Sequence, residues 1–245
     1  MEWLSAQLDV IGPFFFAPHP VSVAVVIAYG LFWSRLGPSV ALGRPGAFFG
    51  LVAGAGMYAI TQVWVRGEPT TAILDLIASN TDLERMDDAR PLIGVVEALI
   101  AGYAEEIVKM FLALLVLFAM GYPRDPRAVT TAAVAPALGL ALFGANVSIT
   151  LTLQELPIDQ GLAFPVIEHG LWVGLNLGTA YLLAKGWLSD RLWLYLVYAG
   201  LLHAIAVYTH TLANLGWHPV VVTAALAVVT LSTFTGGAGA IPSRR

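Results

Sequence analysis

The sequence contains no cysteine among its 245 residues. This absence excludes disulfide bonds and thiolate chemistry, and it restricts any metal site to nitrogen and oxygen ligands. Charged residues are also scarce, at 11% of the chain, against roughly 25% in a typical soluble domain. The formal net charge is only −4, so the composition provides no positive excess for binding nucleic acid, and we expect no nucleic-acid partner.

Apolar residues are abundant instead, at 58% of the chain with a mean hydropathy of +0.78. About 20 apolar residues in a helix cross the roughly 30 Å hydrocarbon core of a bilayer. Long apolar stretches occupy residues 19–36, 45–65, 91–120, 128–152, 162–185, 191–214 and 217–237. We therefore predict an all-α polytopic membrane bundle with seven transmembrane helices, forming one integral membrane domain over residues 1–245. An acidic extracytoplasmic loop is predicted at residues 67–90.

Basic residues alternate between the connections of these segments, which predicts the orientation of the chain in the membrane. One side would carry eight of them: Arg35, Arg44, Arg124, Arg127, Lys185, Arg191, Arg244 and Arg245. The opposite side would carry only Arg66, Arg85 and Arg90. We expect the N-terminus outside and the C-terminus in the cytoplasm, in the plasma membrane of a prokaryote.

Three ionisable residues, Glu105, Glu106 and Lys109, interrupt the third apolar stretch. Such residues at the centre of a bilayer cost several kcal/mol unless they face a partner or a wet cavity. At 100° per residue, Lys109 lies between the two glutamates on one side of the helix. It can pair with one carboxylate and leave the other free. A packed ion-pair cluster, a transport relay and a catalytic site all fit this pattern.

Two later stretches also carry ionisable residues: Glu168 and His169 in one, His203 and His210 in the other. Asn176 lies two turns after His169 on the same helix face. Counting the rise per residue places His169, His203 and Glu105 in the middle to outer half of the membrane. Two histidines and a carboxylate that converge there would suit a hydrolytic zinc site, where a polarised water attacks a carbonyl. We therefore predict zinc bound by His169 and His203, with Glu105 as a further candidate ligand.

At these residues the sequence resembles a known superfamily. The run Glu105–Lys109 (Glu-Glu-Ile-Val-Lys) resembles the EExxK signature of PrsW-type intramembrane proteases, relatives of the CAAX-processing and Abi proteases. The stretches from Glu168 to Gly174 and around His203 resemble two further motifs of that superfamily, with core motifs spread over about residues 91–214. The resemblance implies hydrolysis of peptide bonds in a membrane protein or lipid-anchored peptide. The implied catalytic residues are Glu105, Glu106, Lys109 and Asn146.

Two positions depart from the motifs of this superfamily. Ala145 stands where a glutamate precedes the asparagine Asn146, and Val207 stands where Asn or Asp follows the histidine His203 by four residues. The missing groups would have to come from other side chains. The candidates for this supporting role are Asn146, Glu168, Tyr208 and His210.

A second resemblance is to the anterior-pharynx-defective scaffold subunit of gamma-secretase. It covers chain length, the seven-helix topology and the placement of His169 and His203. This resemblance implies a non-catalytic scaffold with a membrane protein partner, in which small residues allow close helix contact. The candidates are Gly139, Gly144, Gly174 and Gly178. A proton-coupled transporter that uses Glu and His as a relay is the third hypothesis. The protease is the preferred one.

Overall fold

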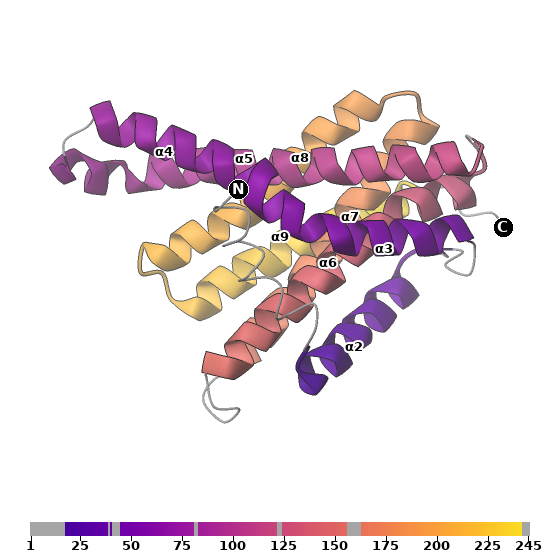
Figure 1. Ribbon diagram of the computed structural model, residues 1–245, viewed down its shortest axis with the longest axis horizontal. Coiled ribbons are helices and arrows are strands. Elements are labelled where there is room, and N and C mark those ends of the chain that lie inside the picture. Colours follow the sequence, from indigo (N-terminus) through magenta and orange to yellow (C-terminus); the bar gives the residue numbers. More distant parts are fainter. Residues whose placement is uncertain are drawn as a thin grey trace, which may run out of the picture.

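The computed structural model describes residues 18–38, 40, 45–80, 83–121, 124–155 and 163–241. Every regular element in these ranges is a helix (Figure 1), which confirms the all-α prediction. The elements are α2 (Pro20–Leu36), α3 (Pro45–Ile60), the π-helix η1 (Thr61–Gly67), α4 (Glu68–Asn80), α5 (Leu83–Ala119), α6 (Pro126–Glu155), α7 (Ala163–Leu188), α8 (Leu192–Asn214) and α9 (Pro219–Gly239).

Each of the seven apolar stretches corresponds to a helix, but two boundaries differ from the prediction. The helix expected at 45–65 ends its α-helical part at Ile60 and continues as the π-helix η1. The helix expected to begin at Pro91 begins at Leu83, with Pro91 inside it. A proline in a helix lacks one N–H donor, and the residues just before it, which include Glu, Arg, Met and Ala, are good helix formers. The predicted loop 67–90 is therefore largely helical, with α4 beside the start of α5 (Figure 1).

In the described part of the chain, three helices are long and apolar enough to cross a membrane: α6, α8 and α9. The helices α2 and α3 are apolar but shorter. Side chains on the outer face of α5 are exposed and apolar, including Phe111 at 54% and Phe118 at 66%. Soluble monomers rarely expose large contiguous apolar patches. These features fit a membrane protein.

Helices α6 and α7 form the centre of the bundle. Helix α6 packs against α2, α3, α5 and α7, and α7 packs in addition against α8 and α9 (Figure 1). Most of the α6 surface is buried, and its side chains are mainly small, which lets several helices approach it closely. A polar residue on α6 or α7 is therefore surrounded by protein on most sides.

Glycines mark the closest helix crossings. A Cβ atom at Gly139 of α6 would collide with the backbone of Leu51 in α3, and one at Gly178 of α7 with the backbone around Phe234 in α9. A Cβ at Gly102 of α5 would meet the backbone of α8. Gly144 and Gly174 make room for the rings of Tyr58 and Trp33, respectively. The predicted role of glycines 139, 144, 174 and 178 in close helix contact is confirmed.

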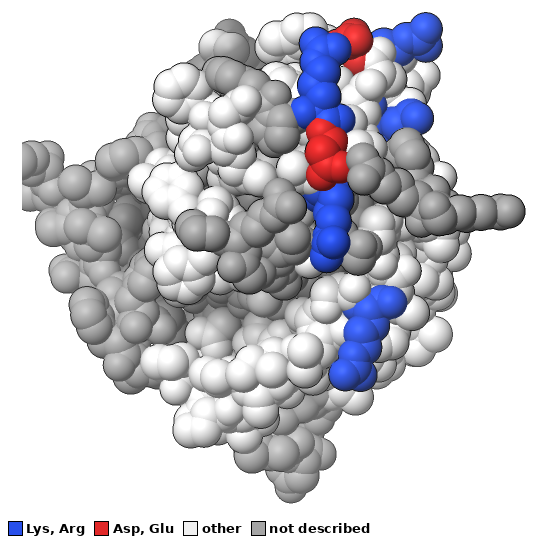
Figure 2. All heavy atoms as spheres, turned by 90° about the vertical axis from the view of Figure 1, so that its right-hand side faces the viewer, with Lys and Arg blue, Asp and Glu red and all other residues white. Residues whose placement is uncertain are grey.

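Basic residues gather at one end of the bundle, where α2, α5, α7 and α9 end and α6 and α8 begin. Gly37, just after α2, lies against Tyr181 in the second half of α7, and the guanidinium of Arg124, before α6, lies 4.0 Å from Asp190 in the turn between α7 and α8. Figure 2 shows this face, with a stripe of Lys and Arg side chains. Its described basic residues are Arg35, Arg124, Arg127, Lys185 and Arg191. Arg44, Arg244 and Arg245 lie outside the described residues.

We expect Gly139→Ala to lower the free energy of unfolding by about 1–3 kcal/mol, the usual cost of overpacking, because the new methyl group meets backbone. Gly56→Ala is the matched control, since nothing lies within 4 Å of a Cβ at Gly56. This control should be neutral or stabilising by up to about 1 kcal/mol. Unfolding in detergent measures both, and an unchanged stability of Gly139→Ala would contradict the close contact with α3.

Candidate functional site

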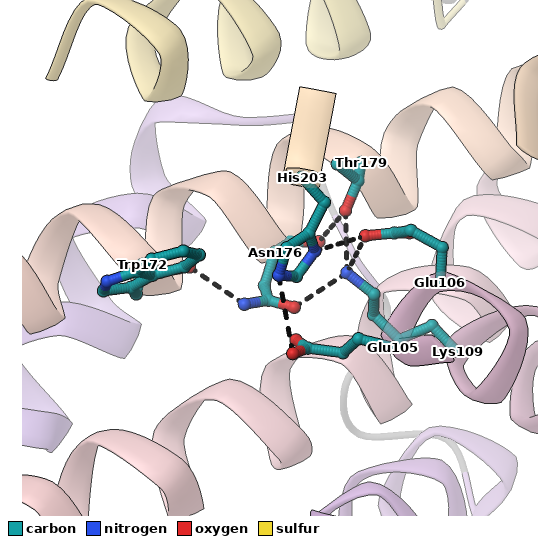
Figure 3. A network of polar contacts seen from close by, with 7 residues as sticks. All are labelled: Glu105, Glu106, Lys109, Trp172, Asn176, Thr179 and His203. Carbon is teal, nitrogen blue, oxygen red and sulfur yellow. Dashed lines mark hydrogen bonds and ion pairs between the residues drawn. The ribbon is translucent and has the colours of Figure 1, made fainter. Parts of the chain in front are cut away.

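Lys109 lies at the centre of a buried polar network that joins α5 to α7 (Figure 3). Its side chain is fully buried and forms an ion pair with Glu106, one turn earlier on α5. The ammonium group also donates to Asn176 Oδ1 at 2.7 Å and to Thr179 Oγ1 at 2.8 Å. An ammonium group has three donors, so the three acceptors satisfy it completely.

Glu106 extends this network to α8. Its side chain is 0% exposed, and its Oε1 lies 2.8 Å from Nδ1 of His203. The other oxygen, Oε2, is buried and has no hydrogen-bond partner among the described residues. Because Lys109 supplies the opposite charge beside it, Glu106 can stay ionised in the core and orient the imidazole of His203.

The acceptors on α7 are themselves fixed. The side-chain amide of Asn176 donates to the backbone carbonyl of Trp172 at 3.1 Å. The hydroxyl of Thr179 lies 3.1 Å from the backbone carbonyl of Asn176. Residues three and four positions apart share a face of a helix, so this face of α7 presents both oxygens to Lys109.

Glu105 lies on the other side of His203. Its Oε2 is 3.5 Å from His203 Nε2, and its side chain is 12% exposed. The imidazole therefore has one carboxylate at each ring nitrogen (Figure 3). The expectation that Lys109 pairs with one glutamate is confirmed, and the paired one is Glu106.

Glu105 and His203 line a cavity of about 320 Å³ between α3, η1, α5, α6, α7 and α8. One wall is a face of small residues on α6, which leaves the space open: Ala141, Gly144, Ala145 and Ser148. Further polar groups on the walls are Tyr58, Gln62, His169, Asn176 and His210. A cavity of this size holds about ten waters at roughly 30 Å³ each.

The cavity reaches the end of the bundle opposite the basic residues. There Nε2 of His210 lies 3.2 Å from Oε1 of Glu168, and these side chains are 50% and 28% exposed. Trp172 lies between this pair and His203. Its ring centroid is 5.6 Å from that of His203, and it stacks on the ring of His210 at 5.5 Å. Glu168 and His210 thus mark the exposed end of the site.

The structure brings together most of the predicted site residues, but not Asn146 and Tyr208. The side chain of Asn146 accepts a hydrogen bond from Ser22 Oγ of α2 at 2.7 Å and does not line the cavity. One position on a helix corresponds to about 100° of rotation, so Ala145 faces the cavity where Asn146 does not. Tyr208 packs beside Ala98 and Ala101 of α5. Of the other two residues predicted for the supporting role, His210 lines the cavity and Glu168 contacts His210 without lining it.

Four residues of the site escaped the sequence analysis: Thr179, Tyr58, Gln62 and Ser148. Thr179 had a signal, because it follows Asn176 by three positions and so shares its helix face. Tyr58 and Gln62 had none, since their place at the cavity depends on how α3 and η1 pack against α6. Ser148 follows Gly144 and Ala145 by one turn on the face that lines the cavity.

The spacing of Glu105 and His203 fits two ligands of one metal ion. Two ligands at 2.0–2.1 Å from a tetrahedral zinc ion lie about 3.3 Å apart, and the two atoms here are 3.5 Å apart. A carboxylate on the other nitrogen of a zinc-binding histidine is also typical, and Glu106 holds that position. Within the described ranges, however, no three His, Asp or Glu side chains are grouped to hold one metal ion. His169 lines the same cavity without joining the pair.

The pair also has an electrostatic requirement. When Nδ1 of His203 donates to Glu106, Nε2 presents a lone pair toward the carboxylate oxygen of Glu105. Two acceptors that face each other repel, and 3.5 Å is too short a separation for a bridging water, so a shared proton or a metal cation must lie between them. The side chains of Glu105 and His203 can therefore share a proton at the wall of the cavity, which is the requirement for general acid–base chemistry.

No protein-family model, no curated protein and no solved structure matches this chain. The function therefore has to be argued from the geometry of the site.

We expect Lys109→Met to destabilise the protein by about 3–5 kcal/mol, because it leaves the carboxylate of Glu106 buried without its counter-charge. Unfolding in detergent measures the loss. The double variant Lys109→Met/Glu106→Gln should recover a large part of it, because no buried charge is then unpaired. Equal stability of the single and double variants would show that the ion pair does not carry this energy.

Proposed function

We propose that this chain is an integral membrane hydrolase that cleaves peptide bonds of membrane proteins or lipid-anchored peptides. One observation carries the proposal: Glu105 and His203 face each other at the wall of a cavity inside an apolar bundle. The exposed apolar side chains outside, such as Phe111, suit contact with lipid. A water-filled cavity with an acid–base pair is what hydrolysis inside a membrane requires.

The proposed placement is seven membrane spans, with the N-terminus outside and the basic end in the cytoplasm of a prokaryote. On α5, Glu105 lies fourteen residues before Ala119, which corresponds to about 21 Å from the basic end. This distance supports a position of the pair in the middle to outer half of the bilayer. The cavity, whose exposed end is at His210, would then open toward the outer side.

In the proposed reaction, Glu105 takes a proton from a water molecule as the water oxygen bonds to the substrate carbonyl carbon. The proton passes from Glu105 to Nε2 of His203 across their 3.5 Å separation. His203 then protonates the departing amine while the C–N bond breaks. Glu106, held by Lys109, fixes the orientation of the imidazole throughout, and Ser148 on the α6 wall is a candidate donor to the carbonyl oxygen.

We further propose zinc as a cofactor in an alternative to this metal-free reaction, with Glu105 and His203 as two ligands and His169 as the candidate third. With zinc on Nε2 of His203, that nitrogen no longer carries the proton, so the two schemes exclude each other. The support is the spacing of the first two and the outer carboxylate of Glu106. When bound, zinc would polarise the attacking water and the substrate carbonyl.

A membrane scaffold is the second candidate function. Its support is the fully buried network of Lys109, Glu106 and Asn176, which fixes α5, α7 and α8 relative to one another without any chemistry. A scaffold would bind a membrane protein partner. A scaffold does not require Glu105 to face a cavity, whereas the hydrolase does. A variant of Glu105 therefore distinguishes the two functions. The transporter hypothesis stays a prediction, to be tested by proton flux in proteoliposomes.

We expect Glu105→Gln to lower hydrolysis by at least about 100-fold, the usual contribution of a positioned general base, while the unfolding midpoint stays close to that of the wild type. The measurement is mass spectrometry of new peptide N-termini in isolated membranes incubated with each variant. Glu97→Gln is the control, because Glu97 is on the same helix and does not line the cavity. Wild-type levels of cleavage in Glu105→Gln would reject the proposed chemistry, whereas no new termini with the wild type would favour the scaffold.

Elemental analysis of the purified protein should find about one zinc per chain in the wild type and none in Glu105→Ala or in His203→Ala. Asn146→Ala should keep its zinc, because Asn146 faces α2 and not the cavity. A folded wild type without zinc would refute the cofactor proposal and leave the reaction to the Glu105 and His203 pair alone.

A further inference from the structure

A second cavity lies at the basic end of the bundle, away from the site described above. It measures about 340 Å³ and lies between the connection from α5 to α6 and the turn from α7 to α8. Its walls include the side chains of Arg124, Asp190, Trp187 and Trp193. None of these residues lines the cavity of Glu105 and His203.

The wall of this second cavity carries one basic and one acidic side chain, Arg124 and Asp190, and the face around it carries an excess of basic residues, which favours an anion. The side chain of Arg124 is 86% exposed, and its contact to Asp190 Oδ1 is 4.0 Å, longer than a hydrogen bond. The other acidic residue nearby, Asp125, caps α6 by accepting from the backbone N–H of Ala128 at 2.9 Å. The same face carries more basic residues than these two acids (Figure 2). The described ones are Arg35, Arg124, Arg127, Lys185 and Arg191.

The first turn of α8 adds to this charge. Arg191 is its N-cap residue and makes no side-chain hydrogen bond to the helix. Leu192 and Trp193, the first residues of α8, are both in the cavity wall. The N–H groups at a helix N-terminus attract anions such as phosphate. Arg124 and this helix end therefore meet at one cavity.

An apolar strip leads from the cavity along α8. Trp193 is 72% exposed, and Leu194, Val197, Leu201 and Ile205 are between 41% and 53% exposed. These four residues follow the helical period and form one stripe. A free phosphate ion makes no use of such a strip, whereas the acyl chains of a phospholipid do.

We propose that this cavity binds the headgroup of an anionic phospholipid. The phosphate lies between Arg124 and the N-terminus of α8, Trp187 and Trp193 lie at the level of the headgroup, and the acyl chains lie along the α8 strip. Tryptophans commonly occupy that level in membrane proteins. The proposal depends on the membrane placement and not on the hydrolase activity.

The test is native mass spectrometry of the full chain in detergent, titrated with phosphatidylglycerol or with phosphatidylcholine of the same acyl chains. The wild type should prefer phosphatidylglycerol. Arg124→Gln should weaken phosphatidylglycerol binding about five-fold, since one basic residue near an anionic lipid surface contributes about 1 kcal/mol. Arg35→Gln is the matched control at the same end of the bundle, outside the cavity, and it should keep most of the binding.

Three results would overturn the proposal. The first is equal affinity for the two lipids. The second is an equal loss in Arg35→Gln and Arg124→Gln, which would indicate diffuse charge rather than a site. The third is displacement of the lipid by inorganic phosphate at the same concentration, which would indicate a site for a free anion. Because Arg124 is exposed, an unchanged unfolding midpoint of Arg124→Gln confirms that the fold is intact.

Discussion

The contact of the Lys109 ammonium group with Glu106, Asn176 and Thr179 is the interaction on which the rest of the site depends. A lone cation or carboxylate in this core would be too costly, so each charge requires the other. The pair fixes α5 against α7, and through Glu106 it reaches His203 on α8. The positions of three helices and the orientation of the imidazole therefore follow from one satisfied ammonium group.

The two adjacent glutamates have different environments for a geometric reason. One residue along a helix turns the side chain by about 100°, so Glu106 enters the buried network and Glu105 reaches the cavity wall. The two departures from the protease motifs, Ala145 and Val207, also line this cavity. The cavity wall is therefore apolar at two positions where the motifs that the sequence resembles have polar side chains, and Glu105 and His203 are two of its remaining polar groups.

The sequence predicted the helices well because each apolar stretch has the length and composition of a buried or lipid-facing helix. The pairing within α5 was also predictable, since Glu106 and Lys109 are one turn apart. What the sequence could not predict is how each helix is rotated against its neighbours. Asn146 faces Ser22 rather than the cavity for that reason. The start of α5 before Pro91 was missed because the boundary signal of proline is only a tendency.

We infer that the cavity with Glu105 and His203 at its wall holds water and opens toward the side opposite the basic end. The chain has no cysteine, so a single Ser148→Cys substitution in the cavity wall can be labelled without background. A charged, membrane-impermeant thiol reagent should modify this cysteine from the outer side of sealed vesicles, and leave a Leu231→Cys control on the exposed apolar face of α9 unmodified. Failure to label Ser148→Cys from the outer side, or labelling from the cytoplasmic side alone, would contradict the account.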